Sequence, residues 1–210
     1  VRRVFRDRHV IIIGKRFRLV HLHHGKDIIE ISTFRRRPSA PQSLHKPSRA
    51  ADAPENMIFH DNEFGNAEED ALRRDFTVNA IFYDPVNSEF KDYTGHGLSD
   101  ITNGIVRSIG DAALRFEEDP VRILRALKLV GQYGFALDAD TEKALVSCMD
   151  LIVHASSSRM TLELEKILKN PYSDGIFAAF RKYGFLKRFL PYLDAKWDTP
   201  QGQYMMELLK

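Results

Sequence analysis

The stretch from Glu117 to Lys128 is the most informative part of this chain. Pro120 within it suits a helix only in its first turn, because proline lacks a backbone N–H. Asp119, directly before it, is a preferred N-cap residue. Apolar side chains then recur at helical spacing, at Val121, Ile123, Leu124, Leu127 and Val130. The sequence therefore predicts a helix that is capped by Asp119 and buries one face.

The other face of this predicted helix carries a row of charges. Arg122, Arg125 and Lys128 follow Asp119 at three-residue steps, so their side chains lie side by side. A carboxylate only accepts hydrogen bonds and a guanidinium only donates them. Asp119 and Arg122 therefore match a base edge with a donor beside an acceptor, as in adenine and cytosine. Guanine and uracil have the reverse order and would leave buried polar groups unpaired, at about 1–3 kcal/mol each.

The same row also has a simpler interpretation, in which Asp119 caps the helix and the cations form a solvated face with weak ion pairs. In the first interpretation, Arg125 and Lys128 hold phosphates or the end of a primer strand. Spacing alone favours the solvated face. A second segment, residues 68–85, changes this balance: it begins acidic and helical and continues into an apolar, strand-like stretch that Asp84-Pro85 closes.

Several motifs follow one another in a defined order. They are EED at 68–70, RRDFT at 73–77, Asp92-Tyr93, GLSD at 97–100, GIVR at 104–107 and EDPVRILRA at 118–126. Together they resemble the class II tRNA nucleotidyltransferase and bacterial poly(A) polymerase family, over roughly residues 10–135. The resemblance implies an α+β fold: a nucleotidyltransferase head of the polymerase-beta type with an antiparallel or mixed sheet, then an all-helical neck and the start of a body.

The resemblance also implies roles for individual residues. In the RRDFT motif, Arg74 would contact the incoming nucleotide, and Asp75 would belong to the catalytic centre or contact the ribose. In the EDxxRxxR motif, Asp119 and Arg122 would read the base, followed by Arg125.

The family pattern also implies roles for Lys128 and for a glycine-containing segment. Lys128 stands where the family often has another arginine, and it keeps the charge without the planar fork. Residues 97–100, together with Gly104, would form a flexible linker between nucleotide-binding strands.

The implied reaction is metal-dependent phosphoryl transfer from ATP, in which carboxylates hold Mg²⁺ ions. The family carries these carboxylates in a Gly-Gly…Asp-x-Asp element that would precede Val1, and no equivalent occurs in this sequence. Asp138-Ala139-Asp140 has the spacing, but it is typical of a loop and helix cap. We therefore expect that the N-terminal part of the head is missing and that this chain alone is inactive.

Glu30 is a weak candidate for a metal ligand. It lies in the middle of an alternating, strand-like stretch, so its carboxylate could complete a metal site or pair with an arginine on the neighbouring strand. His21 and His23 share one face of the preceding strand and His24 lies on the other, which disfavours a histidine metal site.

The chain divides into a mixed half and a helical half. We expect a partial head at residues 1–110, a neck with the nucleotide-reading helix at 111–170, and the start of a helical body at 171–210. Four prolines among small and polar residues predict a flexible loop at 37–58. In the helical half, apolar patterns predict helices at 112–132, 139–153, 159–169 and 173–189.

Residues 9–22 help to separate the two branches of the family. They predict two strands broken at Gly14, and residues 14–21, Gly-Lys-Arg-Phe-Arg-Leu-Val-His, resemble the GR-RF-L-H signature of poly(A) polymerases. We therefore expect AMP addition from ATP to an RNA 3′ end, in mRNA or tRNA. The alternatives are a CCA-adding enzyme and a non-catalytic RNA-binding protein that retains the nucleotide pocket.

Charge and cysteine content agree with this interpretation. The net charge of +2 conceals an asymmetry, because residues 1–50 hold 13 Lys and Arg against 3 Asp and Glu, whereas residues 51–100 hold 3 against 12. A basic N-terminal segment suits a polyanion such as RNA. The single cysteine, Cys148, excludes an internal disulfide and is expected in the core. The sequence contains no run of about 18 apolar residues, so we expect no membrane contact and a cytoplasmic location.

Overall fold

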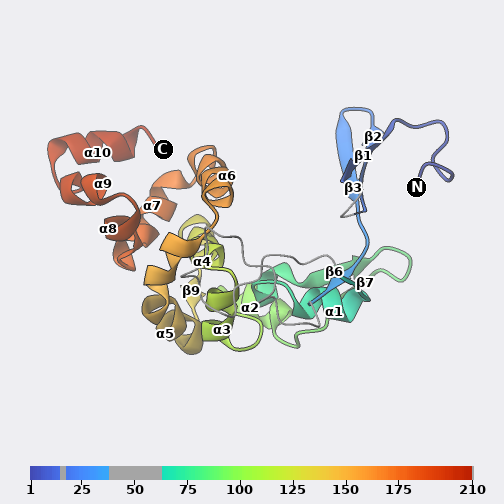
Figure 1. Ribbon diagram of the computed structural model, residues 1–210, viewed down its shortest axis with the longest axis horizontal. Helices are drawn as coiled ribbons and strands as arrows, with labels where there is room; N and C mark the ends of the chain where they lie inside the picture. Colours follow the sequence, from blue (N-terminus) through green and yellow to red (C-terminus); the bar gives the residue numbers. More distant parts are fainter. Residues whose placement is uncertain (15–17, 38–62, 210) are drawn as a thin grey trace.

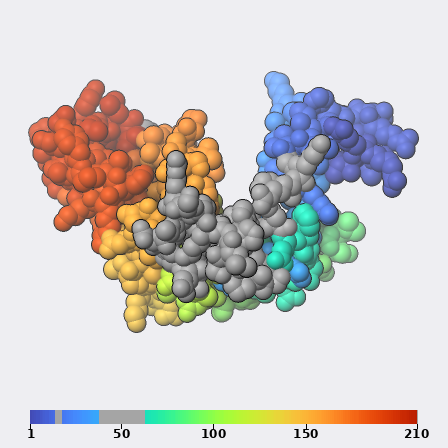
Figure 2. Space-filling model, viewed as in Figure 1, coloured from blue at the N-terminus to red at the C-terminus, as the bar shows by residue number. Residues whose placement is uncertain are grey.

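The computed structural model describes residues 1–14, 18–37 and 63–209. In Figure 1 the chain forms an open U, with a small sheet within residues 10–31 at one end and the helices of residues 157–207 at the other. Figure 2 shows the same two lobes, blue and orange to red, with a hollow in the outline between them. The predicted loop at 37–58 lies outside the described residues, apart from Arg37.

The sheet at the N-terminal end is antiparallel, with the strand order β1-β2-β3. Its strands are β1 (Val10–Gly14), β2 (Leu19–His24) and β3 (Asp27–Ile31). The two strands predicted on either side of Gly14 are therefore confirmed. Leu22 is the buried side chain of this sheet, whereas isoleucines on both outer strands, including Ile12 and Ile28, are exposed. The sheet therefore leaves much of its apolar surface uncovered by the described residues.

The base of the U begins with short elements around the RRDFT motif. They are β4 (Arg35–Arg36) paired antiparallel with β5 (Glu63–Phe64), α1 (Ala67–Leu72), a 3-10 turn (Thr77–Asn79), and β6 (Ile81–Asp84) paired antiparallel with β7 (Glu89–Asp92). A capping box between Asn66 and Glu69 starts α1, which confirms the predicted acidic helix. The strand predicted after it begins only at Ile81, because residues 77–79 turn instead of extending.

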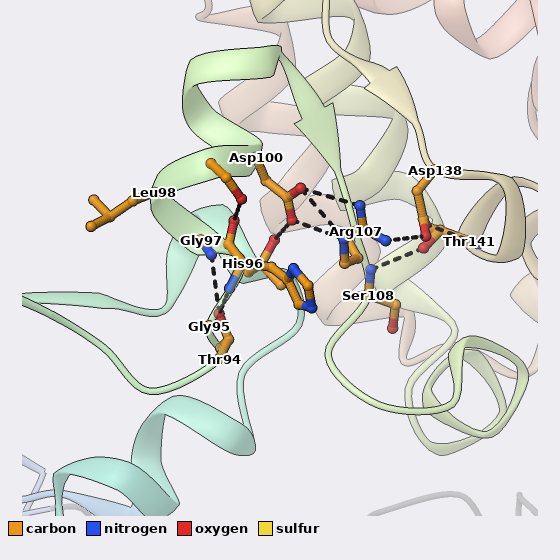
Figure 3. A network of polar contacts seen from close by, with 12 residues as sticks. Thr94, Gly95, His96, Gly97, Leu98, Asp100, Arg107, Ser108, Asp138 and Thr141 are labelled. Atoms are coloured by element: carbon orange, nitrogen blue, oxygen red, sulfur yellow. Dashed lines mark hydrogen bonds and ion pairs between the residues drawn. The ribbon is translucent and has the colours of Figure 1, made fainter.

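Residues 97–100, expected as part of a flexible linker, instead begin the helix α2 (Gly97–Asn103). Figure 3 shows the polar contacts around this helix. Arg107 Nε donates to the buried carboxylate of Asp100 at 3.0 Å, and Arg107 Nη1 donates to Asp138 at 2.9 Å. Asp138 is also the N-cap of α5 (Ala139–Ser147), as predicted for a cap at this position. These ion pairs connect α2 to the helical half.

The helical half follows the predicted pattern, with additional breaks. Its elements are α3 (Ala112–Glu118), α4 (Val121–Tyr133), α5, a 3-10 helix (Met149–His154), α6 (Ser157–Leu168), α7 (Ser173–Lys182), α8 (Phe185–Phe189), α9 (Pro191–Lys196) and α10 (Pro200–Glu207). A parallel strand pair, β8 (Ile105–Val106) with β9 (Ala136–Leu137), lies beside α4. Within the described ranges, no helix is both long and apolar enough to cross a membrane.

The prediction that Asp119 is the N-cap of the next helix is wrong by one residue. Asp119 has an extended backbone and is the C-cap of α3, whereas Pro120 is the N-cap of α4. Pro120 already has helical dihedral angles, and its carbonyl accepts from the N–H of Ile123 at 3.0 Å. The Asp119 carboxylate still accepts from the N–H of Val121 at 3.3 Å. Asp119 therefore lies in the link between two helices.

The main core lies among the helices that follow this link. The predicted apolar face of α4 is confirmed, because Val121, Ile123, Leu124 and Leu127 are fully buried. Cys148 also belongs to this core, and burial raises the pKa of its thiol. The core includes Phe76 from the RRDFT motif, so the motif is anchored directly to the helical half.

Helices α4 and α7 approach each other most closely at two glycines. A Cβ atom added to Gly131 would lie 2.3 Å from the Cα of Ile176, and one added to Gly175 would lie 2.7 Å from the carbonyl oxygen of Gly131. Backbone atoms cannot move aside as a flexible side chain can. The absence of a side chain at Gly131 therefore determines how closely α7 packs on the helix that carries the charged row.

We expect Gly131→Ala to destabilise the protein by about 1–3 kcal/mol, because overpacking forces the two helices apart. The free energy of unfolding, measured in urea, tests this expectation. The control is Val146→Ala on the exposed face of α5, which should change stability by no more than about 0.5 kcal/mol. An unchanged or higher urea midpoint for Gly131→Ala would show that this contact does not limit the packing.

Candidate functional site

One open pocket of about 530 Å³ collects most of the predicted site residues. It lies between the turn after α1, the start of α4 and the start of α6. Its lining residues are Arg35, Arg73, Arg74, Asp75, Asn79, Asp119, Arg122, Arg125 and Arg159. Six arginines against two aspartates make the pocket cationic, and planar guanidinium groups are well suited to phosphate oxygens.

The Asp119 carboxylate is held by an arginine from another helix. Arg159, near the start of α6, donates from both terminal nitrogens to the two Asp119 oxygens, at 2.9 and 2.6 Å. The Asp119 side chain is 14% exposed and that of Arg159 is 42% exposed. Such a two-bond ion pair fixes the orientation of the carboxylate plane. Any base that bonds to Asp119 has to share or replace these contacts.

Arg122 is held from the opposite direction. Its Nη1 donates to the backbone carbonyl of Arg115 at 2.7 Å and to the Glu118 carboxylate at 3.1 Å. Burial lowers the pKa of Arg122, while the nearby charge of Asp119 opposes that effect. The two proposed base readers therefore lie in one pocket, and each is oriented by its own neighbour.

Glu118 connects three arginines behind the pocket. Its buried carboxylate pairs with Arg115 at 2.8 Å, with Arg122 at 3.1 Å, and with Arg37 from the N-terminal part. Arg115 is itself buried, and it also donates to the backbone carbonyls of Arg73 and Arg74. Burial, reinforced by repulsion from Arg122 and Arg37, lowers the pKa of Arg115 to about 9.

A second buried carboxylate, Asp70, organises the other side of the pocket. It accepts from the backbone N–H of Arg35 at 2.9 Å and from the side chains of Arg73 and Arg74 at 2.8 to 3.2 Å. Burial alone would raise the pKa of Asp70, but these donors outweigh it and hold the pKa below its ordinary value. The Arg74 guanidinium also lies over the Phe82 ring, 5.2 Å from its centre.

Asp75 and Arg125 both line the pocket and contact each other. Asp75 Oδ1 accepts from the backbone N–H of Phe76 at 2.9 Å and from Asn79 Nδ2 at 3.1 Å, while Oδ2 lies 3.5 Å from Arg125 Nη1. Arg125 Nη2 lies 3.4 Å from Glu163 on α6. Asp75 is therefore surrounded by hydrogen-bond donors, and Arg125 bridges the RRDFT turn and α6.

Two predicted residues lie outside this pocket. Lys128, one turn beyond Arg125 on α4, is not among the lining residues. Glu30 lies opposite His21 in the neighbouring strand and contacts its Nε2 at 3.1 Å, so its partner on that strand is a histidine instead of the expected arginine. Glu30 lines a neighbouring pocket of about 370 Å³, which shares Arg35, Arg73 and Arg74 with the first.

The described residues include no group of three or more histidine, cysteine, aspartate or glutamate side chains placed to hold a metal ion. Asp75, the acidic residue named by the RRDFT motif, has amide and guanidinium donors around its oxygens where a cation would bind.

Sequence reasoning missed several residues that shape the pocket. Asp70 and Glu118 have arginines three or four positions later, a spacing that already indicates ion pairs within a helical segment. Arg159 had no such signal, because its partner Asp119 is 40 positions away. The backbone contacts of Arg115 are equally distant in the sequence.

Comparison with known families matches two parts of the chain. A family model described as "Poly A polymerase head domain" matches residues 1–107. A second, described as "Probable RNA and SrmB- binding site of polymerase A", matches residues 134–196. The first match alone covers half of the chain.

Curated proteins give the same result. The chain is 32% identical to Poly(A) polymerase I of Haemophilus influenzae over 94% of its length, and 33% identical to the CCA-adding enzyme of Geobacillus thermodenitrificans over 90%. In both cases the chain spans only 43% of the relative.

Solved structures also share the fold. The CCA-adding enzyme of Bacillus stearothermophilus in complex with CTP superposes with a TM-score of 0.65 at 32% identity, over 84% of this chain and 39% of that chain. A tRNA nucleotidyltransferase complexed with a primer tRNA and an incoming ATP analog gives 0.70 at 28% identity, over 93% and 52%. The fold expected from the motifs is therefore confirmed, and the chain belongs to the family of the bacterial poly(A) polymerases and CCA-adding enzymes.

Proposed function

We propose that this chain is the nucleotide-selecting part of an RNA 3′-end nucleotidyltransferase that adds AMP from ATP to RNA. The cationic pocket carries this proposal, because side chains of the RRDFT and EDxxRxxR motifs line the same surface. Family membership supports the reaction class. The proposal keeps the division into a partial head at 1–110, a neck at 111–170 and the start of a body at 171–210.

In this proposal Asp119 and Arg122 select the base. Asp119 accepts from the exocyclic amine of adenine, and Arg122 donates to the ring nitrogen beside it. Their fixed neighbours support this role, because Arg159 and Glu118 orient the two side chains before a base arrives. A pre-oriented pair loses less freedom on binding than two mobile side chains would.

The remaining arginines hold the triphosphate and the ribose. Arg74 and Arg125 both line the pocket and present positive charge to it, so they suit phosphate oxygens. Asp75 assists at the reaction centre or contacts the ribose hydroxyl. Lys128, on the same helix beyond the pocket, contacts the RNA primer. Mg²⁺ is part of the proposed chemistry as the cofactor, with no ligand assigned among these side chains.

Polyadenylation is preferred to CCA addition for two reasons. The poly(A) polymerase relatives align with up to the whole of this chain, and residues 9–22 resemble the signature of that branch. CCA addition is the second candidate, because a relative of that name is 33% identical over 90% of the chain and adenine and cytosine present the same donor and acceptor order. The third candidate is a non-catalytic RNA-binding protein that retains the pocket.

Primer choice separates these candidates. We expect the purified full-length protein, with the part of the head that would precede Val1, to extend a plain RNA primer with successive A residues from ATP, because poly(A) addition does not require the shape of a tRNA. The measurement is gel analysis of labelled primers with each nucleoside triphosphate, run in parallel on a tRNA that lacks its 3′ end. Insertion of C before A on the tRNA alone would replace the proposal with CCA addition. Tight RNA and ATP binding with no extension of either substrate would favour the non-catalytic candidate.

Exchange of the two base readers tests their roles directly. We expect Asp119→Arg combined with Arg122→Asp to move nucleotide preference from A or C toward G or U, because the order of donor and acceptor is reversed. The affinity for every nucleotide should also weaken. The new arginine at position 119 would face Arg159, and the new aspartate at position 122 would face Glu118, so each meets a like charge. The measurement is therefore the ratio of the ATP and GTP dissociation constants.

A matched exchange elsewhere provides the control. Arg181 and Asp198 form a similar two-bond ion pair outside the pocket. Arg181→Asp combined with Asp198→Arg should leave the ratio unchanged. If the exchange at residues 119 and 122 also leaves the ratio unchanged in a folded protein, these residues do not read the base.

A further inference from the structure

Arg115 lies behind the pocket and does not line it. Its side chain is 2% exposed, and it is one of the largest fully buried side chains of the described chain. A buried guanidinium is costly unless its donors are paired, and apolar replacements of buried ion pairs are often as stable. Moreover, its Nε has no hydrogen-bond partner among the residues described. Stability alone is therefore a poor explanation for a cation at this position.

The contacts of Arg115 join the two sides of the pocket. On one side it donates to the carbonyl oxygens of Arg73 and Arg74, the backbone directly before Asp75. On the other side it donates to Glu118 at 2.8 Å, and the same Glu118 oxygen accepts from Arg122 at 3.1 Å. One planar group therefore connects the RRDFT turn to the first turn of α4, although these segments are more than 40 positions apart.

We propose that Arg115 is a positioning residue that sets the distance between the phosphate-binding side of the pocket, at Arg73 and Arg74, and the base-reading side, at Arg122. This inference rests on the proposed function and adds to it a residue that touches neither base nor phosphate. A nucleoside triphosphate contacts both sides at once, so its affinity depends on their spacing. Inorganic tripolyphosphate has no base, so it contacts α4 only through the phosphate-binding Arg125 and depends less on this spacing.

The shape of the side chain distinguishes positioning from simple charge. Arginine has donors in a rigid planar fork, which reach two carbonyls and a carboxylate in different directions. Lysine keeps the positive charge but has one compact ammonium group and cannot make all three contacts in the same geometry. Arg115→Lys therefore removes the connection while retaining the charge.

The experiment measures the dissociation constants of ATP, GTP and tripolyphosphate for the whole purified protein and for Arg115→Lys. We expect ATP binding to weaken roughly tenfold, as for one lost hydrogen bond to a charged group. The ratio of the GTP dissociation constant to the ATP dissociation constant should therefore fall. The dissociation constant of tripolyphosphate should change by less than about twofold. A purely structural role would not alter the ratio.

Two controls separate positioning from loss of stability. Leu145→Ala removes a fully buried side chain of α5 outside the pocket, so it should lower the melting temperature and leave the ratio unchanged. Arg181→Lys makes the same chemical change in an ion pair outside the pocket and should also leave the ratio unchanged. If Arg115→Lys does not fold, Glu118→Gln replaces it, because it weakens the same connection while preserving shape.

The outcomes distinguish this inference from the proposed function. If the unmodified protein shows no preference for ATP over GTP, the proposed base-reading function fails. If it prefers ATP, and folded Arg115→Lys or Glu118→Gln keeps that preference, the positioning role is wrong and the proposed function stands. If ATP and tripolyphosphate weaken equally, Arg115 maintains the fold without setting the spacing.

Discussion

The buried carboxylate of Glu118 is the interaction on which the pocket depends. Three arginines from different parts of the chain, Arg37, Arg115 and Arg122, converge on it. Cations so close together would repel one another strongly in a partly buried region, where little water screens their charge. One buried anion offsets that repulsion and also sets the direction of each guanidinium. The pocket can therefore concentrate positive charge without losing its shape.

Asp70 applies the same principle on the other side of the pocket. It pairs with Arg73 and Arg74, while the Arg35 backbone N–H donates to the same carboxylate. The pocket is thus bounded by two buried acids that hold arginines in place by their charge-assisted bonds. In the proposed function, binding of a triphosphate would require little rearrangement of such groups, since their orientation is already set. The cationic character of the pocket and its rigidity have the same physical origin.

If Asp119 and Arg122 read the base as proposed, their order of donor and acceptor would account for a family that contains both poly(A) polymerases and CCA-adding enzymes. Adenine and cytosine present the same pair of groups, so in the proposed function these two residues would distinguish A and C from G and U. Separation of A from C has to come from elsewhere, through the size of the base or the position of the RNA end. The bond between Asp119 and Arg159 is one place where such a difference can act, since it limits movement of the acceptor.

The sequence by itself determined the local features of this protein: the helix start beside Pro120, the acidic start of α1 and the strands on either side of Gly14. Each depends on neighbours within a few positions, which leave a visible periodicity or cap. Five pocket residues were also named from the resemblance. Only the tertiary structure decided their partners, because Arg159 and Arg115 bond to residues 40 to 42 positions away. Such contacts arise when helices pack together, and no local pattern in the chain records them.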